Sequence, residues 1–294
     1  MLVKLTQSIL VAVSLFGTAA YADFLPPNDL HLQDNQRAMS GMSEAQFNEV
    51  IDEAVAYYAP FIQNNFGAKL VVNRLWNDST VNATASQFGN TWTVNMYGGM
   101  ARRPEINADA FALVLCHEFG HHLGGYPFKA SWAAAEGEAD YFASQSCTRD
   151  LWKDQLEKNA LARNKISEYS KNECDKVWSL EADQDLCYRT ILGGEGLGNL
   201  LMVLTGENIS ASTPSTSVVS KTNISSYPSG QCRLDTYTVG ALCTRDFDAR
   251  AIPGKGLGSL RNTAAAEQES GKYTCTNQEF DSGLRPACWF KPLL

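Results

Sequence analysis

Three of the four histidines in this chain lie within six residues, and two of them belong to the pattern His117-Glu118-Phe119-Gly120-His121. An apolar run, Ala110–Leu115, precedes the pattern and two glycines follow it, which indicates a buried helix ending near Leu123. Residues four apart share one face of a helix, so both imidazoles can bind one metal ion, and Glu118, about 100° round the helix, can reach a water on that ion. Zinc hydrolases activate water with such groups. The alternative is a helix with surface histidines and no metal.

A zinc site of this kind needs a third protein ligand, and three acidic residues follow the motif, at positions 136, 138 and 140. Position 127 is Pro, which excludes the class of metallopeptidases that takes a histidine ligand there. On a helix Glu136 and Asp140 share a face, whereas Glu138 is turned about 200° from Glu136 and is expected to be exposed. Asp140 is expected to accept a hydrogen bond from a ligand imidazole. The predicted site therefore consists of the ligands His117, His121 and Glu136, the general base Glu118, and an open fourth position for water.

Two other interpretations of the motif stay open. The first is a non-peptidase zinc hydrolase that uses the same ligands. The second is a non-catalytic protein with a structural metal, which would need a fourth protein ligand such as Cys116, His122 or Glu138. Cys116 is turned about 100° from the ligand face, so a disulfide is expected for it. His122 is turned about 140°, so a position at the rim of the site or behind the metal ligands is expected for it.

The motif followed by Glu136-Gly-Glu-Ala-Asp140 resembles the gluzincin metallopeptidases of the CAAX-endopeptidase and heat-shock-protease type. Asn82-Ala-Thr-Ala85 and the segment 91–99 are similar to that family's Asn-Ala-x-Ala segment and edge strand, so the resemblance covers about residues 45–150. It implies a zinc endopeptidase acting on a protein or peptide substrate, with a zincin-like core of helix, small mixed sheet, His-Glu-x-x-His helix and Glu helix. It also implies a side chain that stabilises the oxyanion. Arg233 and Tyr237 are candidates by residue type, with a structural ion pair or a buried tyrosine as the commoner alternative.

The elements that must position these groups follow from hydrophobic spacing. A helix is expected over 42–65, capped by Ser43 and with a kink or break near Pro60, and strands are expected over 69–76, 81–87 and 91–97. We expect the third strand to bind an extended peptide substrate through its free main-chain groups, using Trp92, Thr93, Val94, Asn95 and Met96. A fully paired structural strand is the alternative. Residues 150–205 are expected to be helical, with turns at the glycines of 193–198, and 206–230 to form a loop.

The first 22 residues have the pattern of a secretory signal peptide: Lys4, a short apolar run, and Ala20-Tyr21-Ala22 before a cleavage site. The remaining chain contains all eight cysteines, and an even number behind a leader indicates disulfides in an oxidising compartment, secreted or periplasmic. We predict sequential pairing: Cys116–Cys147, Cys174–Cys187, Cys232–Cys243 and Cys275–Cys288.

Composition narrows the class of protein. The net charge is −8 and no basic stripe is present, which argues against nucleic acid as a partner, and no apolar run after the leader predicts a membrane span. We predict an α+β fold in which a zincin-like catalytic core, 23–150, carries a mostly helical, disulfide-stabilised C-terminal region, 151–294.

Overall fold

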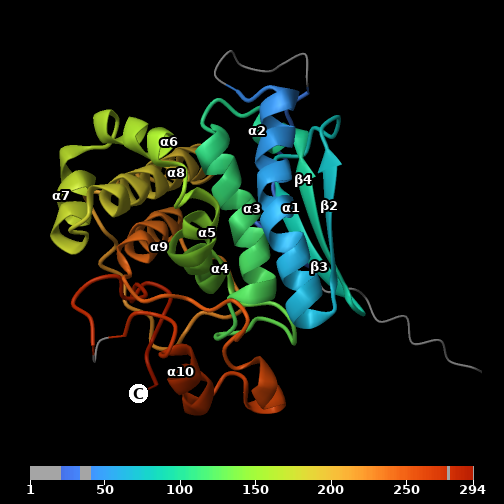
Figure 1. Cartoon of the computed structure of the whole chain (residues 1–294), viewed down its shortest axis with the longest axis vertical. Helices are drawn as coiled ribbons and strands as arrows, with labels where there is room; N and C mark the ends of the chain where they lie inside the picture. The colour runs from blue at the N-terminus through green and yellow to red at the C-terminus, as the bar shows by residue number, and fades with distance from the viewer. Residues whose placement is uncertain (1–20, 34–40, 277–278, 294) are drawn as a thin grey trace, which may run out of the picture.

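The computed structural model describes residues 21–33, 41–276 and 279–293 (Figure 1). The fold is mixed α+β, with one small four-stranded sheet and many helices. The predicted signal peptide lies outside the described residues except for Tyr21 and Ala22, which begin strand β1, so its cleavage stays a prediction. In the part of the chain that the structure describes, none of the helices combines the length and apolar character needed to cross a membrane.

The sheet has the strand order β1-β3-β4-β2, formed by β1 (Tyr21–Asp23), β2 (Lys69–Leu75), β3 (Ala83–Phe88) and β4 (Thr91–Tyr97). Strand β3 pairs antiparallel with β4 and with β1, whereas β2 pairs parallel with β4. Strand β4 lies between β3 and β2, so it is paired along both of its edges. The prediction that Trp92, Thr93, Val94, Asn95 and Met96 offer free main-chain groups to a substrate is therefore wrong, and the alternative of a structural strand is correct.

Helix α1 (Glu44–Phe66) packs against strand β2 and against the helix that carries His117 and His121. Ser43 and Gln46 form the predicted capping box at its start. The helix runs through Pro60 without ending and stops at Gly67, whose φ of 62° lies in the left-handed region. Of the predicted kink or break at Pro60, the break is therefore wrong.

Helix α3 (Ala108–Leu123) lies at the centre of the molecule, beside α1 and between the sheet and the C-terminal helices (Figure 1). Asn107 caps it, and every residue from Ala110 to Leu123 is buried. Short helix α2 (Gly98–Ala101) precedes it. The second site helix begins as α4 (Glu136–Phe142) and continues through a π-helical turn, η2 (Ala143–Cys147), into α5 (Thr148–Trp152).

The C-terminal region contains several helices separated by long stretches without regular structure, and it packs directly on the first part of the chain. Its elements are α6 (Leu156–Ala160), η3 (Leu161–Asn164), α7 (Glu168–Val177), α8 (Glu181–Thr205), α9 (Gly230–Leu242), η4 (Lys255–Leu260) and α10 (Ala264–Ser270). Helix α8 packs against α3, and α9 packs against α4. One hydrophobic cluster includes residues from both regions, such as Phe111 and Leu197.

The glycines of 193–198 lie inside α8, so the turn predicted there is wrong. A Cβ on Gly193 would come within 2.8 Å of Leu113 Cδ1, and one on Gly196 within 3.0 Å of Ala110 Cβ. These glycines therefore let α8 approach α3 closely.

Four disulfides cross-link the chain, which is typical of proteins in an oxidising compartment. The predicted pairs Cys116–Cys147 and Cys174–Cys187 are confirmed, but the other two are wrong: the structure pairs Cys232 with Cys288 and Cys243 with Cys275. Cys232 lies in α9 and Cys243 directly follows it, so the helical rise holds them about 16 Å apart, well beyond the reach of a disulfide.

Candidate metal centre

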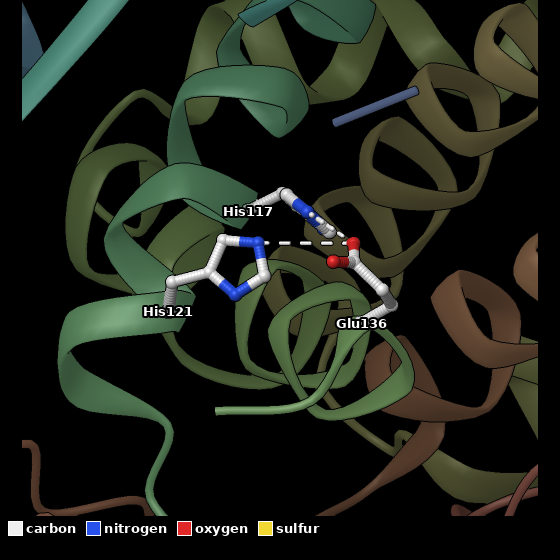
Figure 2. Close-up of side chains that lie close together, drawn as sticks. All are labelled: His117, His121 and Glu136. Atoms are coloured by element: carbon white, nitrogen blue, oxygen red, sulfur yellow. Dashed lines mark ion pairs between the residues drawn. The ribbon is translucent and has the colours of Figure 1, made fainter. Parts of the chain in front are cut away.

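Two helices bring three potential metal ligands together. His117 and His121 lie one turn apart on α3, and Glu136 is the first residue of α4 (Figure 2). The Oε2 atom of Glu136 lies 3.3 Å from His117 Nε2 and 3.7 Å from His121 Nε2. Ligand atoms of the three residues all lie within 4.8 Å of one another, and the side chains are buried. The structure therefore brings the three predicted ligands into a group that could hold a metal ion.

The donor atoms of this group fit a divalent cation. Apart from the ion-pair contacts among themselves, His117 Nε2, His121 Nε2 and Glu136 Oε2 have no hydrogen-bond partner within the described residues, although all three are buried. Buried polar atoms left without a partner are costly, and several such atoms facing one point are explained by an ion bound between them. Imidazole nitrogen and carboxylate oxygen are ligands that suit several transition metals, zinc among them.

The opposite edge of each imidazole is fixed by a hydrogen bond. His117 Nδ1 donates to Asp140 Oδ1 at 2.7 Å, as predicted, and His121 Nδ1 donates to the carbonyl oxygen of Ala134 at 2.9 Å. These bonds select the tautomer that presents Nε2 to the metal position. Burial alone would lower the pKa of His117, but Asp140 and Glu136 raise it to about 9, whereas burial lowers the pKa of His121 to about 3.

Asp140 is itself held by two residues of α9. Arg233 donates to both of its carboxylate oxygens at 2.8 Å, and the Tyr237 hydroxyl donates to Oδ1. Burial would raise the pKa of Asp140, but Arg233 and His117 outweigh it and lower that pKa. Arg233 and Tyr237 therefore lie behind Asp140 and hold it in place. These contacts support the alternative of a structural role for both residues.

Lys129 binds the oxygen of Glu136 that does not face the histidines. Its Nζ lies 2.5 Å from Oε1. Burial would raise the pKa of Glu136, but His121, His117 and Lys129 lower it to about 2. The carboxylate is thus held in its charged form with Oε2 directed at the two imidazoles. Sequence reasoning missed Lys129, because it lies in the link between the two helices and carries no motif.

Glu118 lies fully buried beside the ligand group, and its two carboxylate oxygens have no hydrogen-bond partner among the described residues. Burial raises its pKa well above the ordinary value, a shift that His117 partly offsets and the nearby carboxylates of Glu136 and Asp23 reinforce. A buried carboxylate with a raised pKa beside a metal position has the properties of a general base.

The three residues considered as a fourth ligand have other partners. Cys116 forms the disulfide with Cys147. The ring of His122 stacks between Trp92 and Trp132, each centroid 5.0 Å away. The prediction that Glu138 is exposed is wrong. It is fully buried, and Arg285 donates to its two oxygens at 2.7 and 2.9 Å.

Two further residues near the centre come from distant parts of the sequence. The ring of Phe24 packs edge-on against His117, with centroids 5.1 Å apart, and the Tyr227 hydroxyl donates to the carbonyl oxygen of Asp23 at 3.1 Å. Neither residue belongs to a motif, and hydrophobic spacing cannot connect them to the site.

Comparisons with family models, with curated proteins and with solved structures found no match for this chain.

Proposed function

We propose that the protein is a zinc-dependent endopeptidase with a zincin-like core that acts in a secreted or periplasmic setting. The observation that carries the proposal is the convergence of two imidazoles and one carboxylate beside an unpartnered, buried Glu118. The disulfides and the leader-like sequence support the compartment.

Zinc is the metal that this donor set favours. Catalytic zinc sites with two histidines and one glutamate keep a fourth position for water, whereas structural sites are closed by four protein ligands. Cys116 forms a disulfide and Glu138 is bound by Arg285, so neither is free to act as a fourth metal ligand. This supports an open site. Zinc bound here would lower the pKa of its water to about 7 and polarise a carbonyl group.

The side chains divide the work of peptide hydrolysis. Glu118 accepts the proton of the attacking water and delivers it to the leaving amine. Asp140 and Lys129 hold His117 and Glu136 in place through the contacts described above. The Tyr227 hydroxyl, which donates to a backbone carbonyl beside the site, is suited to donate to the carbonyl oxygen of a substrate.

The test is hydrolysis of a fluorescently labelled unfolded protein by the zinc-loaded protein, with Glu118→Gln as the matched variant. Loss of a general base lowers turnover by roughly 100- to 10,000-fold. We expect a loss of that size while zinc stoichiometry stays at one per chain. Equal activity in the two proteins would contradict the proposal. Hydrolysis of esters without cleavage of peptides would identify a non-peptidase zinc hydrolase instead.

A further inference from the structure

The outer edge of β3 is occupied by the chain's own N-terminal segment. Strand β1 pairs antiparallel with β3, with Asp23 opposite Thr84. The next two residues extend the pairing, because Phe24 N donates to the carbonyl of Ala83 at 2.9 Å and Leu25 N donates to Asn82 Oδ1 at 2.9 Å. Since β4 is paired on both sides, β3 provides the sheet edge nearest to this segment, and the segment already fills it.

The same segment lies against the metal centre. Phe24 is fully buried with its ring on His117, and its carbonyl accepts from Arg233 Nη1 at 2.6 Å. The preceding carbonyl, that of Asp23, accepts from Tyr227. An extended substrate pairs with a sheet edge through main-chain hydrogen bonds, as this segment does with β3. The chain thus places a peptide of its own where such contacts are made.

The centre that Phe24 contacts through His117 is enclosed. His117, Glu118 and His121 have no exposed surface and Glu136 retains 4%. A polypeptide must bring its scissile bond to the metal position, so it cannot react while these side chains stay covered.

We propose that residues 21–27 form an autoinhibitory segment that occupies the substrate edge of β3 and covers the metal centre until it is withdrawn or removed. This inference rests on the proposed function for its enzymatic meaning, but the covering of the metal can be tested separately. Cleavage of a leader after Ala22 would leave the contacts of Asp23, Phe24 and Leu25 in place, so the mature chain would still be latent.

The structure also provides a place where the segment can be cut. Pro27 and Asp29 are exposed, and beyond them the chain is attached again, because Leu32 N donates to Ser79 O and Val81 N donates to Leu30 O. A cut between Pro27 and Asp29 therefore separates the covering segment from a stretch that stays anchored to the body.

The experiment cuts the folded full chain. A recognition sequence for a site-specific protease is inserted after Pro27, and the same sequence is inserted after Ser217, in an exposed stretch of the 206–229 loop, as the control. Mass spectrometry confirms loss of the N-terminal piece. The first readout is the rate at which a colorimetric chelator removes bound zinc, and the second is hydrolysis of the labelled unfolded protein.

We expect both rates to rise at least tenfold after the cut at Pro27 and to stay unchanged after the control cut. Addition of the peptide Tyr-Ala-Asp-Phe-Leu-Pro-Pro should slow both again. A second perturbation needs no protease: Phe24→Asp places a charge in the covered position and should expel the segment in the intact chain. Its control is Phe88→Asp, on the β3 phenylalanine that is 84% exposed.

The outcomes separate the two proposals. Faster zinc removal without hydrolysis would support the covering role and contradict the peptidase. Unchanged zinc removal and unchanged hydrolysis, after loss of the segment and in Phe24→Asp, would overturn the autoinhibitory role.

Discussion

The distance between α3 and α4 is set by Gly120, and replacing it by alanine should disturb the metal centre without touching a ligand. A Cβ at this position would lie 2.7 Å from the carbonyl oxygen and 2.8 Å from the Cα of Ala139. Both are backbone atoms, so no side chain can turn away. Restoring an ordinary contact of 3.4 Å requires α4 to move by about 0.7 Å, and α4 carries Glu136.

The expected effect on metal binding is larger than the effect on stability. Overpacking costs about 1–3 kcal/mol, and the better helix propensity of alanine returns about 1 kcal/mol, so the net loss of unfolding free energy is about 0–2 kcal/mol. Ligand distances in metal sites tolerate only about 0.2 Å, so a shift of 0.7 Å should weaken zinc binding by about 10- to 100-fold. Competition with a chelator of known affinity measures that loss.

Gly198→Ala is the matched control, because this residue lies in a helix and its Cβ would approach only side chains, the nearest being Leu234 Cδ2 at 3.3 Å. It should leave zinc affinity unchanged and raise stability by up to about 1 kcal/mol. If Gly120→Ala bound zinc as tightly as the unchanged protein, the argument that close helix packing positions Glu136 would be refuted.

Three further predictions concern charges around the site. Asp140→Asn should weaken zinc binding about 10- to 100-fold, measured by isothermal titration, because the His117 imidazole loses its charged partner. Arg285→Met leaves the Glu138 carboxylate buried and unpaired, so it should lower the free energy of unfolding, measured by urea denaturation, by about 3–5 kcal/mol. Adding Glu138→Gln to this variant should restore part of the loss, and no recovery would refute the explanation. The folded-state pKa of Glu136, about 2, lies below its ordinary value. Its ionised carboxylate therefore stabilises the folded state above about pH 4.5, and this stabilisation is lost as pH falls toward 2. The free energy of unfolding of the zinc-free protein should fall by at most about 3 kcal/mol over that pH range. The same fall with pH in a Glu136→Gln variant would contradict this.

The sequence was sufficient where local spacing determines geometry. The four-residue interval fixes His117 and His121 on one helix face, and the same interval relates Glu136 to Asp140, so the ligand group and the bond from His117 to Asp140 could both be predicted. The cap at Ser43 follows from local chemistry in the same way.

The errors concern partners that are distant in the sequence. Spacing alone predicted an exposed Glu138, but Arg285, almost 150 residues further on, binds it in the interior. Strand β4 could bind a substrate through its main chain only if one of its edges stayed free. Strand β2 pairs with that edge, and strand propensity does not predict this pairing. The glycines of α8 were predicted to form turns. The single sequence does not show that α3 packs against them and that a larger side chain would not fit.

We propose that His117, His121 and Glu136 hold one zinc ion and leave a position open. X-ray absorption spectroscopy of the zinc-loaded protein tests it most directly. We expect two imidazole nitrogens and oxygen neighbours at about 2.0–2.2 Å, with one nitrogen lost in His121→Ala. A sulfur neighbour at about 2.3 Å, or a zinc environment unchanged by His121→Ala, would contradict it.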